Sequence, residues 1–130
     1  MPVLLVEDDE AVRSTISEIF MEAGLQVLEA ADAADAMVIL GDPSQHIDIL
    51  VTDLDLGPGD DGLALAAQAR RELPLLHVIY ATGSPERLTD HDFLPREKLF
   101  IKPFSPAALA DTVCALSSLA ARACGRQALR

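Results

Sequence analysis

The chain has 130 residues, and its 21 acidic and 10 basic residues give a net charge of −11. This acidic balance argues against direct binding to nucleic acid or to an anionic membrane surface, because both need a basic surface. The length suits one domain, and a hydrophobic share of 50% is enough for a full core. The excess acid lies in residues 1–61, where Arg13 is the single base.

Targeting and redox signals are weak. The apolar runs are far shorter than the roughly 20 residues of a membrane span, and the N-terminus has no basic leader region. Cys114 and Cys124 do not have the spacing of a metal or redox motif. We therefore expect a reduced, cytoplasmic protein.

Apolar runs and helical periodicities alternate along the chain. We expect strands at residues 3–6, 25–29, 47–52, 77–81 and 99–101. Helices are expected at 12–23, 33–40 and 63–73, and a last helix begins at Pro106 with Ser105 as its cap. Leu109, Val113, Leu116 and Ala120 share one face of that last helix. The order predicts an α/β fold, a doubly wound five-stranded parallel sheet with helices on both faces.

Polar residues follow four of the five expected strands. Parallel strands joined by right-handed crossovers end at one edge of the sheet, where ligands bind. The residues at these ends are Glu7 and Asp8 after the first strand, Asp53 and Asp55 after the third, Thr82 after the fourth and Lys102 after the fifth. The second strand is followed only by alanines, which suits an edge strand in the order 2-1-3-4-5.

This set of residues predicts phosphoryl chemistry with a divalent metal. Crowded carboxylates repel one another, and Mg²⁺, which prefers oxygen ligands, relieves the repulsion. A lysine suits a phosphoryl group, and an aspartate can accept one covalently. Singly, each residue has a simpler interpretation: Glu7 and Asp8 as acids at a helix start, Asp53 as a turn residue, Thr82 as a loop residue. Their convergence favours a functional site.

Four short motifs carry a family resemblance. They are Leu5-Val6-Glu7-Asp8-Asp9, Val51-Thr52-Asp53-Leu54-Asp55-Leu56, Ala81-Thr82-Gly83 and Ile101-Lys102-Pro103-Phe104. In this order the sequence resembles a response-regulator receiver domain of two-component signal transduction, which has a CheY-like, flavodoxin-like fold. The resemblance covers about residues 2–121, so we expect a receiver domain at 1–121 and a frayed tail at 122–130.

The resemblance implies a role for each residue of the set. Asp53 would take a phosphoryl group from a histidine kinase or a histidine phosphotransfer protein. Asp8 and Asp53 would bind Mg²⁺ directly, Glu7 mostly through water, and Asp55 through its backbone carbonyl. Thr82 would turn toward the phosphoryl oxygens, Lys102 would bond them, and the Lys102–Pro103 bond would be cis. The chain would then be a signalling phosphoacceptor, not an enzyme beyond self-phosphorylation and slow autodephosphorylation, and its downstream protein partner is not indicated.

The sequence departs from the family pattern in three places. The stretch from Asp53 to Gly62 has one extra residue, within 57–61. The usual switch aromatic lies three residues before the lysine, where this chain has Leu99, with Phe100 next to it. This leaves open whether the family's aromatic–threonine coupling operates. The segment between Thr82 and Lys102 is short and contains two prolines, so we expect a short or irregular fourth helix.

Two alternatives come from other classes. A pseudo-receiver would bind partners without phosphorylation. A haloacid-dehalogenase-like phosphohydrolase would use Asp53 as nucleophile and Asp55 as general acid/base, but that family places the motif on its first strand. The length leaves no room for a DNA-binding output domain, so we expect a stand-alone receiver or a piece of a larger protein.

Overall fold

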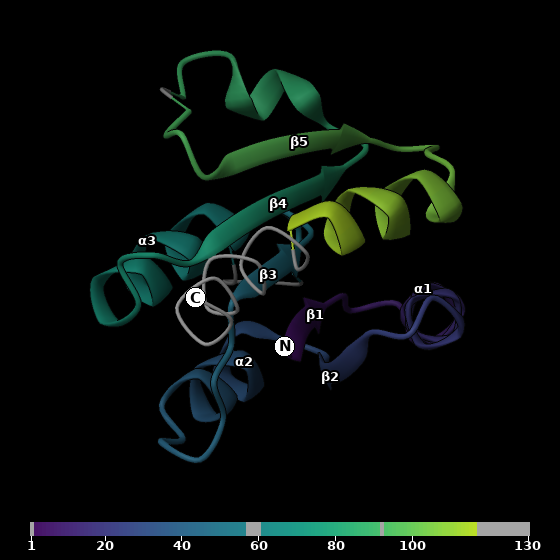
Figure 1. Cartoon of the computed structure of the whole chain (residues 1–130). Helices are drawn as coiled ribbons and strands as arrows, with labels where there is room; N and C mark the ends of the chain where they lie inside the picture. The colour runs from purple at the N-terminus through teal and green to yellow at the C-terminus, as the bar shows by residue number, and fades with distance from the viewer. Residues whose placement is uncertain (1, 57–60, 92, 117–130) are drawn as a thin grey trace, which may run out of the picture.

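The chain alternates strands and helices as predicted. The computed structural model describes residues 2–56, 61–91 and 93–116. The elements are β1 (Pro2–Val6), α1 (Glu10–Glu22), β2 (Gln26–Ala30), α2 (Ala33–Leu40), β3 (Ile49–Thr52), α3 (Gly62–Glu72), β4 (His77–Thr82), the 3₁₀ helix η1 (Pro85–Leu88) and β5 (Glu97–Ile101). Residues 106–116 form a further helix, here called the C-terminal helix, shown in yellow-green in Figure 1.

The five strands form one sheet in the order β2-β1-β3-β4-β5, and every pair is parallel. The predicted fold class and strand order are therefore confirmed, with β2 at one edge. All four residues of β3 are buried, as expected of a central parallel strand covered on both faces.

Helices cover both faces of the sheet (Figure 1). Alternate strand residues point to opposite faces, so Leu4 and Leu50 pack with residues of α2 and α3, whereas Val3 and Ile49 pack with α1 and the C-terminal helix. On this second face, Leu109, Val113 and Leu116 are buried as predicted. Ala120 and the expected tail lie outside the described residues.

Local capping explains where the helices begin. The side chains of Asp9, Asp32 and Asp61 accept hydrogen bonds from backbone amides in the first turns of α1, α2 and α3. The C-terminal helix begins at residue 106, and Ser105 Oγ accepts from the Ala108 amide at 3.2 Å, which confirms the predicted cap. Gly24 follows α1 with φ of 87°, a conformation that glycine adopts without strain.

The sequence misplaced the start of two strands by two residues, and the starts of β1 and β2 by one residue. β3 begins two residues later than expected, although Ile47 is buried. β5 begins two residues earlier, at Glu97, whose charge masked the strand although its side chain is buried. The fourth helix is the four-residue η1, which confirms the expected short or irregular form. Among the described residues, no helix combines the length and the apolar character needed to cross a bilayer.

Candidate functional site

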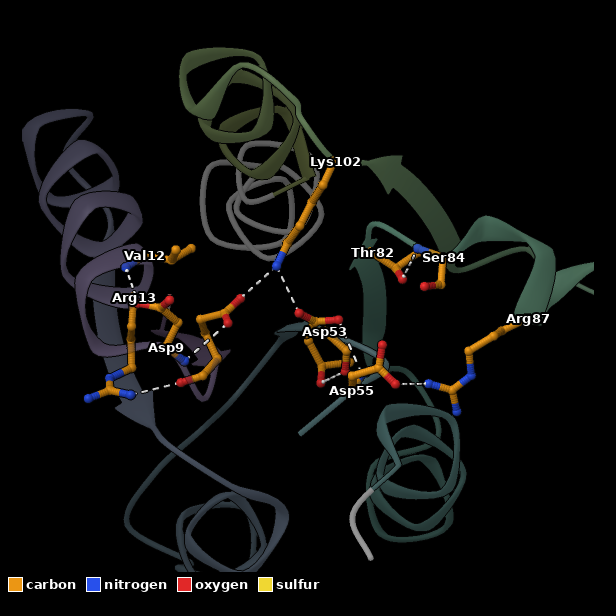
Figure 2. A network of polar contacts seen from close by, with 11 residues as sticks. Asp9, Val12, Arg13, Asp53, Asp55, Thr82, Ser84, Arg87 and Lys102 are labelled. Carbon is orange, nitrogen blue, oxygen red and sulfur yellow. Dashed lines mark hydrogen bonds and ion pairs between the residues drawn. The ribbon is translucent and has the colours of Figure 1, made fainter. Parts of the chain in front are cut away.

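The expected site residues gather at one edge of the sheet. Glu7 follows β1, Asp53 follows β3, Thr82 ends β4 and Lys102 follows β5. Because the strands are parallel, these ends converge, and Figure 2 shows Lys102 extended toward Asp53. Glu7 and Asp53 are only 4% and 8% exposed, so their carboxylates are far more buried than is usual for acids.

Lys102 bridges the two buried carboxylates. Its Nζ donates to Asp53 Oδ2 at 2.8 Å and to Glu7 Oε2 at 3.1 Å. Burial alone would lower the pKa of Lys102, but these two contacts outweigh it and raise the pKa. Burial raises the pKa of Glu7 despite the hydrogen bonds from Lys102 and the Asp9 amide. The ammonium is therefore held charged between two acids. The Lys102–Pro103 bond is cis, as the resemblance implies.

Asp8 is the third acid beside Glu7 and Asp53, and it leaves this cluster of three carboxylates with an excess of negative charge. Carboxylate oxygens of Glu7, Asp8 and Asp53 all lie within 4.8 Å of one another. Three carboxylates against the one ammonium of Lys102 leave a formal charge of −2, which one divalent cation would neutralise. All-oxygen donors with one exposed acid, Asp8, suit a hard cation that keeps several waters. The residues present therefore fit Mg²⁺.

Arg13 holds the backbone at Glu7, the first residue of this cluster. It is the single base in residues 1–61, and its Nη1 donates to the backbone carbonyl of Glu7 at 2.8 Å. Its Nε also lies 3.4 Å from Glu29 on β2. Asp9, in contrast, acts as the cap of α1, so within the run of four acids at residues 7–10 its role is structural.

Asp55 places its backbone and its side chain in different surroundings. Its amide donates to Asp53 Oδ1 at 3.2 Å, which helps to fix the Asp53 carboxylate. Its carboxylate is exposed and is paired with Arg87 (Figure 2). The backbone of Asp55 is thus tied to Asp53, whereas its side chain points toward η1.

Gly62 is required for the tight return of the chain beneath Asp53. A Cβ at Gly62 would lie 2.1 Å from the Asp53 backbone carbonyl oxygen, a separation that atoms cannot occupy. The Gly62 amide also donates to the Leu54 carbonyl at 2.9 Å. The extra residue of the sequence falls between the bridged pair Asp55 and Asp61, in a stretch mostly outside the described residues.

Thr82 lies at the same edge of the sheet, but its hydroxyl is hydrogen-bonded within its own segment of chain. Its side chain is fully buried, and Oγ1 accepts from the Ser84 amide at 2.9 Å. The Lys102 amide donates to the Thr82 carbonyl at 2.7 Å, so the two residues are joined through their backbones. Among the described residues, no side-chain hydrogen bond links Thr82 to Asp53.

Phe100 does not take the place of the missing aromatic at Leu99. Neighbouring strand residues point to opposite faces: Leu99 packs with the α2/α3 face and Phe100 with the α1 face. Phe100 instead meets Phe104 edge-to-face with ring centroids 5.9 Å apart. The aromatic that shares the Leu99 face is Tyr80, which is paired with Leu99 in register.

Sequence reasoning missed two groups of residues around η1. Arg87 pairs with Asp55 and Asp61, and buried Glu97 binds Tyr80 and His91. Tyr80 and His91 lie outside the four short motifs of the sequence. No local motif marks either group, because each pairs residues distant in sequence that only the fold brings together.

Known proteins resemble this chain along most of its length. The family model described as "Response regulator receiver domain" matches residues 3–113. The chain is 35% identical over 114 residues to the sensor kinase CckA of Brucella abortus, covering 85% of this chain and 12% of that protein. It is 31% identical over 109 residues to the aerobic respiration control protein ArcA of Escherichia coli K12, covering 82% of this chain and 44% of ArcA. It thus spans less than half the length of both curated relatives.

A solved structure agrees with these matches. The receiver domain of the hybrid histidine kinase CckA superposes with a TM-score of 0.75 at 31% identity, covering 89% of this chain and 98% of that one. The sheet order, the acidic cluster and the lysine after β5 occur together in one chain that the receiver model matches over most of its length. The chain belongs to the response regulator receiver domain family of two-component systems.

Proposed function

We propose that the chain is a phosphoacceptor, phosphorylated on Asp53 by a histidine kinase or a histidine phosphotransfer protein with Mg²⁺ present. The observation that carries this proposal is the Asp53 carboxylate itself. It is 8% exposed, one oxygen accepts from Lys102 at 2.8 Å, and the other accepts from the Asp55 amide at 3.2 Å. Both oxygens are thus fixed at the edge where Glu7 and Asp8 lie.

The proposed transfer needs positioning and charge neutralisation. An Asp53 oxygen attacks the phosphorus of phosphohistidine, the P–N bond breaks, and the histidine nitrogen keeps the electron pair and takes a proton from solvent. Lys102 neutralises negative charge beside the acceptor, and Thr82 turns its hydroxyl toward the phosphoryl oxygens. The aspartyl phosphate is later hydrolysed slowly, so the domain is not an enzyme in the ordinary sense.

Mg²⁺ would be held by the carboxylates of Asp8 and Asp53 and the backbone carbonyl of Asp55, with Glu7 acting through water. It supplies charge neutralisation for the incoming phosphoryl oxygens. The −2 excess of the cluster supports this assignment, because without a cation the three acids repel one another. The raised pKa of Glu7 is consistent with a crowded, buried acid.

Family membership supports a protein donor, because receiver domains interact with histidine kinases or phosphotransfer proteins. We propose that the donor lies over an apolar groove of about 540 Å³ next to Lys102. Its lining comes from α1 and from the chain after β5: Ala11, Val12, Thr15, Ile16, Lys102, Pro103, Phe104 and Pro106. Because Lys102 belongs to both the groove and the site, a donor seated there can bring its phosphohistidine to Asp53.

Phosphorylation would then shift a two-state equilibrium of the loops around Thr82 and Lys102, which changes a surface read by a downstream protein. The described part of this domain ends at residue 116, and we propose that the domain extends to about 121.

The two alternative functions, a pseudo-receiver and a phosphohydrolase, are weaker. A pseudo-receiver would not need Lys102 bonded to Asp53, and a phosphohydrolase would need a free Asp55 carboxylate, which here is paired with Arg87.

The test is phosphorylation from a small donor. Wild type and Asp53→Asn are incubated with acetyl phosphate, with and without Mg²⁺, and their intact masses are measured. We expect an acid-stable, base-labile adduct of one phosphoryl group on wild type only, dependent on Mg²⁺. Absence of an adduct from acetyl phosphate and from cognate kinases would reject the proposal, and turnover of small phosphate esters that requires Asp55 would favour the hydrolase.

A further inference from the structure

Arg87 joins the two loops that lie beside Asp53. It comes from η1, after β4, and its Nη1 is hydrogen-bonded to Asp55 Oδ1 while its Nη2 lies 3.4 Å from Asp61 Oδ1. Asp55 and Asp61 belong to the segment between β3 and α3. In Figure 2, Lys102 reaches Asp53 from one side, and Arg87 meets Asp55 on the other. Asp53 thus lies between two cations. Lys102 contacts Asp53 itself, and Arg87 contacts Asp55 and Asp61.

Each end of this contact is fixed by the backbone around it. The Arg87 amide donates to the Ser84 carbonyl at 3.1 Å, and the next residue, Leu88, is buried in the core. On the other side, Asp55 and Asp61 form a β-bridge. Asp61 Oδ1 also caps α3 by accepting from the Leu63 amide at 2.8 Å. The two acids therefore present adjacent oxygens to one guanidinium, a geometry that favours arginine over lysine.

We propose that the Arg87–Asp55–Asp61 contact closes the loop after β4 over the acceptor and prolongs the lifetime of the aspartyl phosphate. This inference rests on the proposed phosphorylation of Asp53. Arg87 is a positioning residue, because it acts through Asp55 and Asp61. Thr82 ends β4, and its hydroxyl accepts from the amide of Ser84 in the loop that follows, so the contact also restrains the position of the Thr82 hydroxyl.

The step affected is hydrolysis. A water oxygen attacks phosphorus, the bond between phosphorus and the Asp53 oxygen breaks, and the Asp53 carboxylate leaves with the electron pair. Inorganic phosphate is released, and the proton of the attacking water passes to phosphate or solvent. The attacking water approaches from the side opposite to Asp53, outside the strand ends, where the loop after β4, held by Arg87, restricts its entry. Releasing Arg87 should therefore shorten the phosphoryl lifetime.

The size of the effect follows from exposure. The side chains of Arg87, Asp55 and Asp61 are 34%, 66% and 44% exposed, so solvent screens the contact. Exposed ion pairs contribute up to about 1 kcal/mol, which corresponds to about a fivefold change in rate. The same exposure predicts sensitivity to salt, because an ionic strength of 1 M reduces the screening length to about 3 Å.

The experiment measures the decay of the phosphoryl adduct. Wild type, Arg87→Ala, Arg87→Lys and Asp61→Asn are phosphorylated with acetyl phosphate at saturating Mg²⁺, the donor is removed, and intact mass is followed over time at low and high salt. Asparagine can still cap α3, so Asp61→Asn removes charge without removing the cap. Arg71→Ala is the control, because Arg71 is an exposed arginine of α3 that has no ion pair within the described residues.

We expect decay about fivefold faster in Arg87→Ala, an intermediate rate in Arg87→Lys and Asp61→Asn, and no change in Arg71→Ala. High salt should accelerate decay in wild type and leave Arg87→Ala unchanged, a pattern that loss of structure would not produce. Decay in Arg87→Ala that equals wild type or is slower would refute the inference while the phosphorylation of Asp53 stands. Absence of an adduct on wild type would instead refute the proposed function.

Discussion

Removing the carboxylate of Glu97, a buried acid at the start of β5, should destabilise the domain. Glu97 is 9% exposed at the start of β5. Its Oε2 accepts from the Tyr80 hydroxyl at 2.7 Å, and its Oε1 accepts from the Leu94 amide at 2.8 Å and lies 2.9 Å from His91 Nε2. Glu97→Ala leaves all three donors without this acceptor.

The loss can be estimated from these contacts. Tyr80 is 1% exposed, so its hydroxyl has no ready access to water. An unsatisfied buried donor costs about 1–3 kcal/mol, and breaking a buried charged contact on one side costs about 3–5 kcal/mol. Arg70 Nη1, which is buried and lies 3.6 Å from Glu97 Oε2, would also lose this ion pair. We expect a loss of about 3 kcal/mol in the free energy of unfolding, a large share of the 5–15 kcal/mol typical of a domain.

The assay is urea unfolding followed by circular dichroism and by tyrosine absorbance. Tyr80 is the single tyrosine and the chain has no tryptophan, so its signal reports directly on this contact. Burial, with the hydrogen bond and charge of Glu97, raises the pKa of Tyr80, and the variant should lower it. Glu86→Ala, at an exposed position of η1, is the control. Equal stability of Glu97→Ala and Glu86→Ala would refute the reasoning.

Three further predictions concern Gly62, the groove beside Lys102 and the protonation of Glu97. Gly62→Ala should lower the free energy of unfolding by about 1–3 kcal/mol and slow phosphorylation by acetyl phosphate. In Gly83→Ala the added Cβ would lie 3.9 Å from its nearest neighbour, so this variant should be as stable as wild type in urea. Ala11→Arg should block phosphoryl transfer from a phosphorylated protein donor but not from acetyl phosphate. Ser14→Arg, at an exposed position of α1 outside the groove lining, is the control. Unimpaired transfer to Ala11→Arg from the protein donor would contradict the groove assignment. The stability difference between wild type and Glu97→Gln should shrink as pH falls below about 4.5, measured by urea unfolding.

The sign of this pH dependence comes from the competing effects on Glu97. Burial raises the pKa of its carboxyl, but hydrogen bonds from the Leu94 amide, Tyr80 and His91 outweigh burial, so the pKa lies below its ordinary 4.5. The unfolded state then binds the proton more readily than the folded state. The stabilising contribution is complete above the unfolded pKa and is lost as pH falls through the folded pKa. A difference that grew on acidification would contradict this account.

The sequence could predict the edge of the sheet because strand ends are local features. Apolar runs mark the strands, parallel pairing follows from alternation with helices, and the residues after each run must then meet. Glu7, Asp53 and Lys102 were found this way, and their distances of 2.8 and 3.1 Å confirm that they come together. The prediction needed only the order of elements and the right-handed crossover, not the packing of any side chain.

The contacts around η1 could not be predicted because they depend on packing between distant segments. In the sequence, Glu97 next to Lys98 has the pattern of a solvent-exposed charge. In the fold, Glu97 is buried and Lys98 is exposed. Its hydrogen bond to Tyr80 spans 17 residues, and the Arg87–Asp55 contact spans 32. The segment between β4 and β5 has only a 3₁₀ helix in its described part, so its position depends on these polar contacts and on Leu88. Because the Arg87 contact is exposed and the Glu97 contact is buried, salt should loosen the first and leave the second intact.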